Sequence, residues 1–333
     1  MKKRYIVTGA AGHLGGTILR LLQGRNTEVV GLLRQGERPV AESGNIRYIY
    51  GDVCCPETLE PLFADGAGRD MVVIHTAGLI SIAGKVFPQV REVNVNGTAN
   101  MVEMAGRHGV SRFVYVSSVH AIPEPSGGGI IREVERFSPD LVTGGYAKTK
   151  AEATQLVLDE AAWGFPAVVV HPSGIIGPYD AGRNHLTQLV ADYLRGKLSL
   201  CVRGGYDFVD VRDVAQGCLL AAERGEVGKC YILSGHYLTV RELLCRAGQL
   251  AGRKPPKMVP MPLAKLAAPV VQLAAQLQGH RSLYTKYSLH TVTSNSNFSR
   301  ERAEEELGYR PREMEETVRN MVEWMEGFAV EPF

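Results

Sequence analysis

The first half of the chain alternates short β-branched runs with longer helical patterns. The predicted strands are apolar along most of their length and cover residues 5–8, 28–33, 46–50, 71–75, 113–117 and 167–171. Helical patterns lie between them at residues 14–22, 56–63, 86–108 and 146–163. Strands that are apolar on both faces and separated by helices are typical of a parallel sheet covered on each side. The sequence therefore predicts an α/β fold with a doubly wound parallel sheet.

After Gly177-Pro178 the helical patterns dominate. They cover residues 184–195, 211–223, 240–251, 263–278 and 313–326, with a short strand at 230–233. We predict that residues 1–178 form the domain that contains the parallel sheet and that residues 209–235 return to it. Residues 179–208 and 236–333 are predicted to form a smaller, mainly helical substrate-binding cap.

Composition excludes several classes of partner. The formal charge is +2 and the basic residues are scattered, which argues against a nucleic acid or an acidic membrane surface. The most apolar segment, residues 263–277, is interrupted by Lys265 and Pro269, so it predicts an amphipathic core helix and no membrane span. The six cysteines form no metal-binding spacing, so no metal is expected. Met-Lys-Lys-Arg precedes a strand with no signal-peptide core, and we expect a cytoplasmic protein.

A glycine-rich turn, Thr8-Gly9-Ala10-Ala11-Gly12-His13-Leu14-Gly15, follows the first predicted strand directly. Glycines let the backbone approach a pyrophosphate, and the helix N-terminus supplies N–H donors. Structural turns between a strand and a helix also use glycine, but the strand before and the helix after favour a dinucleotide site. Residues 1–178 are therefore predicted to be a dinucleotide-binding Rossmann domain, and the cofactor residues predicted here are Gly9, Ala11, Gly12, His13, Leu14 and Gly15.

Residues at the ends of the next two strands are candidates for contacts with the adenosine part of the dinucleotide. Arg34 stands where an arginine accommodates a 2′-phosphate, which favours NADP(H) without excluding NAD(H). The alternative is a solvated arginine in a loop that also holds Arg38. Asp52, followed by Val53, would accept a hydrogen bond from the adenine amino group; a turn-capping role before Pro56 is the alternative.

Further motifs follow in order: His75-Thr76-Ala77-Gly78, Asn94-Val95-Asn96-Gly97-Thr98, Val116-Ser117-Ser118, Tyr146-Ala147-Lys148-Thr149-Lys150, His171-Pro172-Ser173-Gly174 with Gly177-Pro178, and Phe208-Val209-Asp210-Val211-Arg212-Asp213-Val214. With the glycine turn and Asp52, they make nearly the whole chain resemble the extended short-chain dehydrogenase/reductase superfamily, also described as the NAD-dependent epimerase/dehydratase family. It is most similar to bacterial dihydroflavonol-reductase-like and 3β-hydroxysteroid-dehydrogenase-like members.

The resemblance implies further site residues and a quaternary structure. Lys150 would bind the nicotinamide ribose, and Asn94 would brace the sheet; a proton relay through Asn94 is the alternative. Other implied cofactor contacts are Thr76, Ala77, Gly78, Asn96, Val116, Tyr146, Pro172, Ser173, Gly174 and Ile175. A homodimer formed through the helices at 86–108 and 146–163 is also implied.

The catalytic residues implied by the resemblance are Ser118, Tyr146 and Lys150, and they make chemical sense. Tyr146 and Lys150 are four residues apart on a predicted helix and so share one face. A free phenol has a pKa near ~10, and a neighbouring ammonium together with an oxidised nicotinamide would lower it. Ser118 follows the fifth strand and would hold the substrate oxygen; Ser117 is the rival that family spacing disfavours.

Two departures from the family pattern bear on the substrate. Sugar-nucleotide enzymes usually have Arg-Asp-aromatic where this chain has Tyr206-Asp207-Phe208, and commonly an asparagine where it has Ser173. We therefore expect reversible hydride transfer to a small, largely uncharged ketone or aldehyde. The alternatives are a nucleotide-sugar epimerase or dehydratase and a catalytically silent dinucleotide sensor. Substrate contacts are predicted at Ser118, His120, Tyr179 and Tyr206, with Leu186, Tyr284 and Tyr287 as further cap residues.

Overall fold

The computed structural model describes residues 3–66, 68–82, 84–181, 184–264, 266 and 286–327. Its centre is a seven-stranded sheet in the order β10-β6-β5-β4-β1-β2-β3, with every pair parallel. The strands are β1 (Arg4–Thr8), β2 (Glu28–Leu33), β3 (Ile46–Tyr50), β4 (Met71–His75), β5 (Arg112–Val116), β6 (Ala167–Pro172) and β10 (Cys230–Leu233). The predicted fold class is confirmed. The strand order reverses between β1 and β4, where parallel α/β sheets bind ligands beyond the strands' carboxyl ends.

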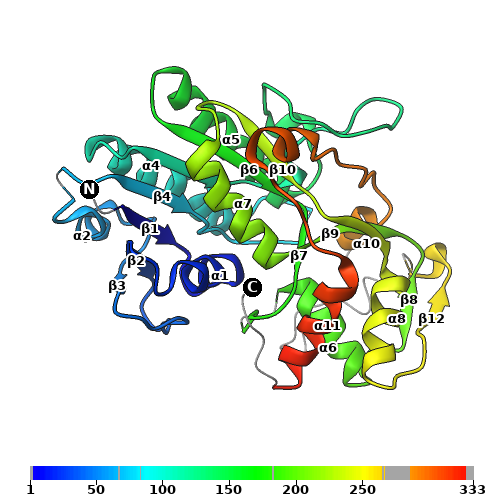
Figure 1. Cartoon of the computed structure of the whole chain (residues 1–333). Coiled ribbons are helices and arrows are strands. Elements are labelled where there is room, and N and C mark those ends of the chain that lie inside the picture. Colours follow the sequence, from blue (N-terminus) through cyan, green and yellow to red (C-terminus); the bar gives the residue numbers. More distant parts are fainter. Residues whose placement is uncertain are drawn as a thin grey trace.

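Helices cover both faces of this sheet (Figure 1). Helices α1 (His13–Leu22) and α7 (Val211–Arg224) pack on one face, and α4 (Gly97–Arg107) and α5 (Gly145–Ala162) pack on the other. Alternate side chains of a strand point to opposite faces. Tyr5 and Val7 accordingly join the α1/α7 core, whereas Ile6 joins the core beneath α4 and α5. The two apolar layers hold the carboxyl ends of the strands at one edge.

The predicted helix at residues 86–108 is divided in the structure. It consists of α3 (Pro88–Arg91), a wider π-helical turn at Glu92–Asn96 and α4. The wider turn places Asn94 fully buried, and π-helical turns are frequent at functional sites. The predicted segment at 56–63 is similarly a 3₁₀ turn, Pro56–Thr58, followed by α2 (Glu60–Phe63).

The second half contains small sheets as well as helices. The helices are α6 (His185–Leu194), α8 (Val240–Leu250), α10 (Lys286–Thr291) and α11 (Met314–Met325), with a π-helical turn at Ala303–Leu307. A three-stranded sheet joins β7 (Gly174–Ile176), β9 (Gly205–Asp210) and β11 (His236–Thr239), and β8 (Leu200–Val202) pairs with β12 (Lys257–Val259). Sequence patterns predicted none of these five short strands. Most of the predicted helix 263–278 and Tyr284 lie outside the described residues.

Most of these later elements gather beside the carboxyl edge of the main sheet, whereas the π-helical turn at Ala303–Leu307 packs against α7 and β10 (Figure 1). Strand β9 pairs with β7, which follows β6 directly, so the second half is joined to the sheet beside the site. Strand β10 returns to the main sheet and pairs with β6. In the described part of the chain, every helix is too short or too polar to span a bilayer.

Candidate active site

The glycine turn after β1 closes tightly on itself. Gly9 adopts φ +66°, and its carbonyl oxygen accepts a hydrogen bond from the Gly12 N–H at 2.9 Å. A Cβ added at Gly15 would lie 2.2 Å from the Gly9 oxygen, so a side chain there is incompatible with the turn. Helix α1 begins at this point without a side-chain cap and without an acidic residue in its first turn. These features fit a bound pyrophosphate, because the N–H groups of the helix end remain available for an anion.

His13 connects α1 to the segment after β7. The Asn184 amide Nδ2 lies 3.3 Å from His13 Nδ1, which must therefore accept the hydrogen bond. His13 Nε2 then carries the proton and donates to the Pro178 carbonyl at 2.8 Å. Burial lowers the pKa of His13, consistent with a neutral ring. Leu14 is buried behind the turn, whereas Ala11 is half-buried and Gly12 is exposed.

Arg34 and Asp52 each have a local partner. Arg34 is 59% exposed and forms an ion pair with Glu37 at 2.9 Å. Asp52 accepts a hydrogen bond from the Cys54 N–H at 2.9 Å, so it does cap the turn before Pro56. Adenine binding by Asp52 remains a prediction. Val53 packs against Gly97, where an added Cβ would lie 2.6 Å from the valine side chain.

The segment after β4 lies against the glycine turn. The Thr76 hydroxyl donates to the Thr8 carbonyl at 2.7 Å, and the Ala77 N–H donates to the Thr8 hydroxyl at 3.1 Å. A Cβ added at Gly78 would lie 3.6 Å from Lys150 Nζ, so this backbone passes close to the lysine. Asn94 accepts from the Leu79 N–H at 2.7 Å and donates to the Leu79 carbonyl at 3.0 Å. These two bonds show that Asn94 braces the segment.

Asn96 faces away from this segment. Its side chain donates to Glu92 at 2.6 Å and accepts from Arg91 at 3.5 Å on the exposed side of the helix. Its cofactor role remains a prediction.

Ser118, Tyr146 and Lys150 gather beyond the carboxyl end of β5. The Ser118 hydroxyl lies close enough to the Tyr146 phenol to lower the pKa of that phenol. Lys150, fully buried on the same helix, donates from Nζ to the Val116 carbonyl at 2.7 Å. Ser117 instead hydrogen-bonds Thr154 in the core at 2.6 Å. Of the two rival serines, Ser118 is therefore the one beside the Tyr146 phenol.

Burial shifts the pKa values of the tyrosine and the lysine. It raises the pKa of Tyr146, and the nearby Ser118 hydroxyl opposes that rise. It lowers the pKa of Lys150 to about 7, because the ammonium is removed from water without a carboxylate beside it. In the protein without a cofactor, the pKa of Tyr146 is therefore raised, whereas the sequence predicts a lowered pKa. Its lowering in the complex with an oxidised nicotinamide remains a prediction.

The segment after β6 is buried beside the catalytic residues. Pro172, Ser173 and Gly174 are buried and Ile175 is half-buried. A Cβ at Gly174 would lie 2.7 Å from the Tyr206 ring, so glycine permits that contact. His171 Nδ1 donates to the Ser118 carbonyl at 2.9 Å, and the ring stacks on Phe137 at 5.2 Å between centroids. His171 thus supports Ser118 from the core.

A cavity of about 350 Å³ is lined by His120, a neighbour of Tyr146, although Tyr146 itself is not among its lining residues. His120 and Tyr206 form one wall: their rings stack at 5.5 Å, and His120 Nε2 lies 3.0 Å from the Tyr206 hydroxyl. The Tyr146 ring approaches His120 edge-on at 6.3 Å. The cavity lining comprises Val119, His120, Ile122, Glu124, Ile131, Leu141, Val142, Thr143, Tyr206, Tyr287, His290, Thr291, Thr293, Ser294, Asn295 and Phe298. In the described part of the chain, this lining contains no lysine or arginine.

The other predicted substrate residues are placed differently. Tyr179 has φ +73°, and its ring packs on the Arg20 guanidinium of α1 at 5.0 Å, outside the cavity lining. Its role in substrate binding remains a prediction. Burial lowers the pKa of His120 to about 4, so this ring is neutral and offers the cavity a hydrogen-bonding group without charge.

Comparison with known proteins identifies the family. A sequence profile described as the NAD dependent epimerase/dehydratase family matches residues 5–234. The chain belongs to this family. It is an NAD-binding enzyme of the extended short-chain dehydrogenase/reductase type, which confirms the resemblance drawn from the motifs.

Individual family relatives cover almost the whole chain. Sterol demethylase protein B of Methylococcus capsulatus is 29% identical, over 96% of this chain and 97% of that protein. The 4-hydroxy-2-methyl-3-oxo-4-farnesyl-3,4-dihydroquinoline-1-oxide ketoreductase of Stigmatella aurantiaca is 30% identical, over 93% of this chain and 92% of that protein. The crystal structure of gox2253 aligns with a TM-score of 0.81 at 31% identity, covering 97% of each chain.

Sequence reasoning missed two groups of residues in this family member. The cavity wall from residues 290–298 comes from a segment far along the chain, and no local motif marks it. The second group lies behind Lys150, where the Tyr115 hydroxyl is 3.4 Å from Nζ. Tyr115 lies inside the predicted strand 113–117, and the sequence predicts no role in the site for it. Its place directly before Val116-Ser117-Ser118 was the available signal.

Proposed function

We propose that the protein is an NAD(P)-dependent oxidoreductase that interconverts a compact, uncharged ketone or aldehyde and the corresponding alcohol. The observation that carries this proposal is the grouping of Ser118, Tyr146 and the buried Lys150 beyond β5, with Tyr146 6.3 Å from His120, which lines a cavity of about 350 Å³. General acid–base chemistry requires a proton-bearing group within hydrogen-bond reach of the reacting oxygen. Tyr146 is that group.

The cofactor would occupy the edge of the sheet where the strand order reverses. The glycine turn and the uncapped start of α1 would hold its pyrophosphate, and Lys150 its nicotinamide ribose. When bound, the nicotinamide supplies or accepts the hydride. We propose a preference for NADP(H), supported by Arg34 at the end of β2.

The protein's own residues handle the proton and the oxygen. In the reductive direction the carbonyl carbon gains a hydride, and the Tyr146 phenol gives its proton to the carbonyl oxygen, leaving a tyrosinate and the alcohol. Ser118 donates a hydrogen bond to the same oxygen and fixes its position. The Lys150 ammonium favours the tyrosinate through its positive charge. Oxidation of the alcohol follows the same steps in reverse.

The cavity supports an uncharged substrate. Its wall combines apolar side chains with hydroxyl groups and the neutral His120, whereas His290 and Glu124, the single acid among the described lining residues, are exposed. A sugar diphosphate normally requires cations, because buried phosphate charge must be paired. Tyr206 stands at the position where sugar-nucleotide members have an arginine. The names of the relatives, a sterol demethylase protein and a ketoreductase, agree with a neutral alicyclic or fused-ring substrate.

We further propose a cytoplasmic homodimer that pairs the helices at 86–108 and 146–163. Light scattering tests the dimer: an elution mass near that of one chain would contradict it.

A substrate panel tests the proposed reaction. The purified protein is incubated with NADPH or NADH and a set of uncharged cyclic ketones, including 3-ketosteroids, beside UDP-glucose and dTDP-glucose. We expect cofactor oxidation with at least one ketone and none with either sugar nucleotide. Turnover of a sugar nucleotide alone would support the epimerase or dehydratase alternative. Tight cofactor binding without any turnover would support a dinucleotide sensor.

A further inference from the structure

A series of buried polar side chains runs from Lys150 into the sheet, away from the cavity. Lys150 Nζ lies 3.4 Å from the Tyr115 hydroxyl oxygen and 4.8 Å from the centroid of the Tyr115 ring. The Thr98 hydroxyl lies close enough to the Tyr115 hydroxyl to lower the pKa of that phenol. His75 joins Thr98 through Nε2 at 3.1 Å and Thr8 through Nδ1 at 2.8 Å. We refer to Tyr115, Thr98, His75 and Thr8 as the polar chain.

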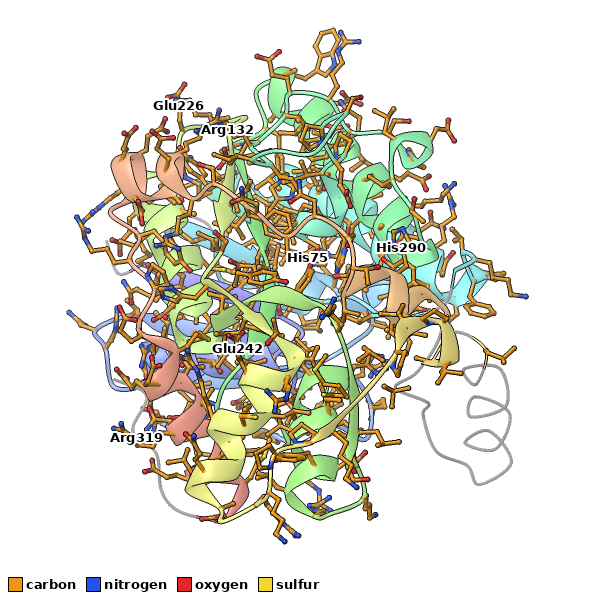
Figure 2. All side chains as sticks on the ribbon, turned by 90° about the vertical axis from the view of Figure 1, so that its right-hand side faces the viewer. His75, Arg132, Glu226, Glu242, His290 and Arg319 are labelled. Atoms are coloured by element: carbon orange, nitrogen blue, oxygen red, sulfur yellow. The ribbon has the colours of Figure 1, made fainter. Side chains whose placement is uncertain are left out.

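The polar chain is completely enclosed. All four of its members are 0% exposed, and Figure 2 shows His75 near the middle of the molecule. It crosses three adjacent strands, from β5 through β4 to β1, with Thr98 contributed by α4. Buried polar groups must find partners inside the protein, so each hydrogen bond in such a series has a direction that its neighbours determine.

Those directions begin at Thr98. Its single hydroxyl proton is donated to the Asn94 carbonyl at 2.8 Å. The Thr98 oxygen therefore accepts from His75 Nε2–H, and we infer that its remaining lone pair faces the Tyr115 O–H. With its proton directed toward Thr98, the Tyr115 hydroxyl presents an oxygen lone pair to Lys150 Nζ, which donates to it at 3.4 Å.

The hydrogen bonds at the Thr8 end of the polar chain require the same donor and acceptor assignments. The Ala77 N–H donates to the Thr8 hydroxyl oxygen at 3.1 Å. The Thr8 O–H then donates to His75 Nδ1, since Nε2 already holds the proton of the neutral ring. Burial lowers the pKa of His75 to about 3, so the ring stays neutral. The series ends on Thr8, directly before Gly9 of the glycine turn.

Lys150 depends on Tyr115 because its other surroundings offer no negative charge. In the part of the chain that the structure describes, no ion pair includes Lys150. The titratable groups around it are Tyr146 on its own helix and Tyr115, His75 and His171 on the strands beneath. Both histidines are held neutral by burial. An ammonium here is stabilised by the Val116 carbonyl, the Tyr115 oxygen and the face of the Tyr115 ring.

We propose that Tyr115 is a positioning residue for Lys150. Its hydroxyl, oriented by the rest of the polar chain, accepts a hydrogen bond from the lysine and keeps that amine protonated and in place. Through Thr8 the same series ties the position of the amine to the glycine turn. The catalytic meaning of this inference rests on the proposed function, because a protonated Lys150 matters for its effect on Tyr146.

Direct titration of Lys150 tests the proposal without any substrate. The full-length protein is labelled with [ε-¹³C]lysine, and its carbon resonances are followed against pH by NMR; Lys150→Arg identifies the signal. We expect Tyr115→Phe, which keeps the ring and removes the hydroxyl, to lower the pKa of Lys150 by about 0.5–1 unit. Tyr115→Leu, which also removes the ring, should lower it further.

Two other variants separate orientation from general damage. Thr98→Val removes the acceptor of the Tyr115 proton, and we expect a smaller decrease in the pKa of Lys150. Tyr231→Phe is the matched control: Tyr231 is equally buried, and its hydroxyl bonds the Glu226 N–H at 3.0 Å and Glu306 at 2.7 Å, far along the chain from the site. It should leave the pKa of Lys150 unchanged. Circular dichroism checks that each variant is folded.

The pH profile of turnover provides a second readout. Alcohol oxidation needs the Tyr146 phenolate, so its rate rises with pH; a less protonated Lys150 moves that rise to higher pH in Tyr115→Phe. An unchanged or raised Lys150 pKa in folded Tyr115→Phe and Thr98→Val overturns the inference. A wild-type protein that is inactive on every ketone counts against the proposed function alone, since the lysine titration is still measurable.

Discussion

The cofactor side and the substrate side of this site are built in different ways. The cofactor side is a contiguous turn, residues 8–15, whose shape is imposed by backbone contacts such as the one between Gly12 and Gly9. The substrate cavity is assembled from segments between residues 119 and 298, and its wall depends on tertiary packing of His120 against Tyr206. A backbone-determined site can be recognised in a short stretch of sequence. A site assembled from side chains far apart in sequence cannot.

Helix α5 is where the two sides meet. Tyr146 at its start is half-buried next to the cavity, and Lys150 one turn later is enclosed beneath it. The difference predicts that mutations on one side alter one binding constant and leave the other unchanged, whereas mutations at the meeting point alter turnover itself.

The largest effect among the tests of this comparison is expected at Ser118. Ser118→Ala removes the hydroxyl beside Tyr146 that would hold the substrate oxygen, and we expect kcat to fall by roughly 10²–10³ with cofactor affinity unchanged. Ser117→Ala is the control, because that hydroxyl faces Thr154 in the core. Steady-state kinetics with a fluorescence titration of NADPH measures both. Equal losses in the two variants would contradict the assignment.

A cofactor-side change should leave the cavity intact. Gly15→Ala places a methyl group 2.2 Å from the Gly9 oxygen, so the turn must open, and we expect NADPH binding to weaken by roughly 100-fold. Gly44→Ala is the control, since an added Cβ there meets nothing within 4 Å and Gly44 lacks a positive φ. Calorimetric titration gives the affinities. Wild-type affinity in a folded Gly15→Ala protein would show that the turn does not hold the cofactor.

A mutation in the cavity should weaken substrate binding and leave cofactor binding unchanged. Tyr206→Phe removes the hydroxyl paired with His120, and we expect KM for the ketone to rise roughly fivefold while NADPH affinity stays constant. Tyr193→Phe is a matched control, since that buried hydroxyl bonds the Lys254 carbonyl at 2.9 Å away from the cavity lining. If Tyr206→Phe changed cofactor affinity but not KM, the division between the two sides would be wrong.

The smallest effect is expected at Arg34. Its guanidinium is mostly exposed and shared with Glu37, so its contribution is screened by solvent. We expect Arg34→Ala to weaken NADPH binding about threefold and to leave NADH binding unchanged. Comparing the two cofactors in one titration series checks this. A variant that binds both as tightly as wild type removes the support for an NADP(H) preference.

Local sequence predicted the main sheet because its strands are continuous apolar runs. Every strand from β1 to β6 was located in this way, and so was β10. The short strand β9 was missed because Asp207 and Asp210 interrupt its apolar pattern; both carboxylates are buried and bonded, to the Gly235 N–H and to Arg212 respectively. Tertiary partners of this kind override the local pattern.

The site shows the same division. The spacing of Tyr146 and Lys150 and the glycine turn were readable, because each depends on neighbours within a few residues. The contact between Tyr115 and Lys150 joins strand β5 to helix α5, which packs on the sheet. The spacing of 35 residues between them carries no signal in one sequence. The rings around His120 come from β9 and α10, which sequence could not bring together.

The most direct test of the account is the loss of one oxygen atom at Tyr146. Tyr146→Phe is loaded with NADPH, and a single turnover of a ketone identified by the panel is followed by the decay of NADPH absorbance. We predict a rate at least about 10³-fold below wild type, with the dissociation constant of NADPH within about twofold of wild type. A Tyr146→Phe protein that reduces the ketone at close to the wild-type rate would contradict the central claim that this phenol supplies the proton.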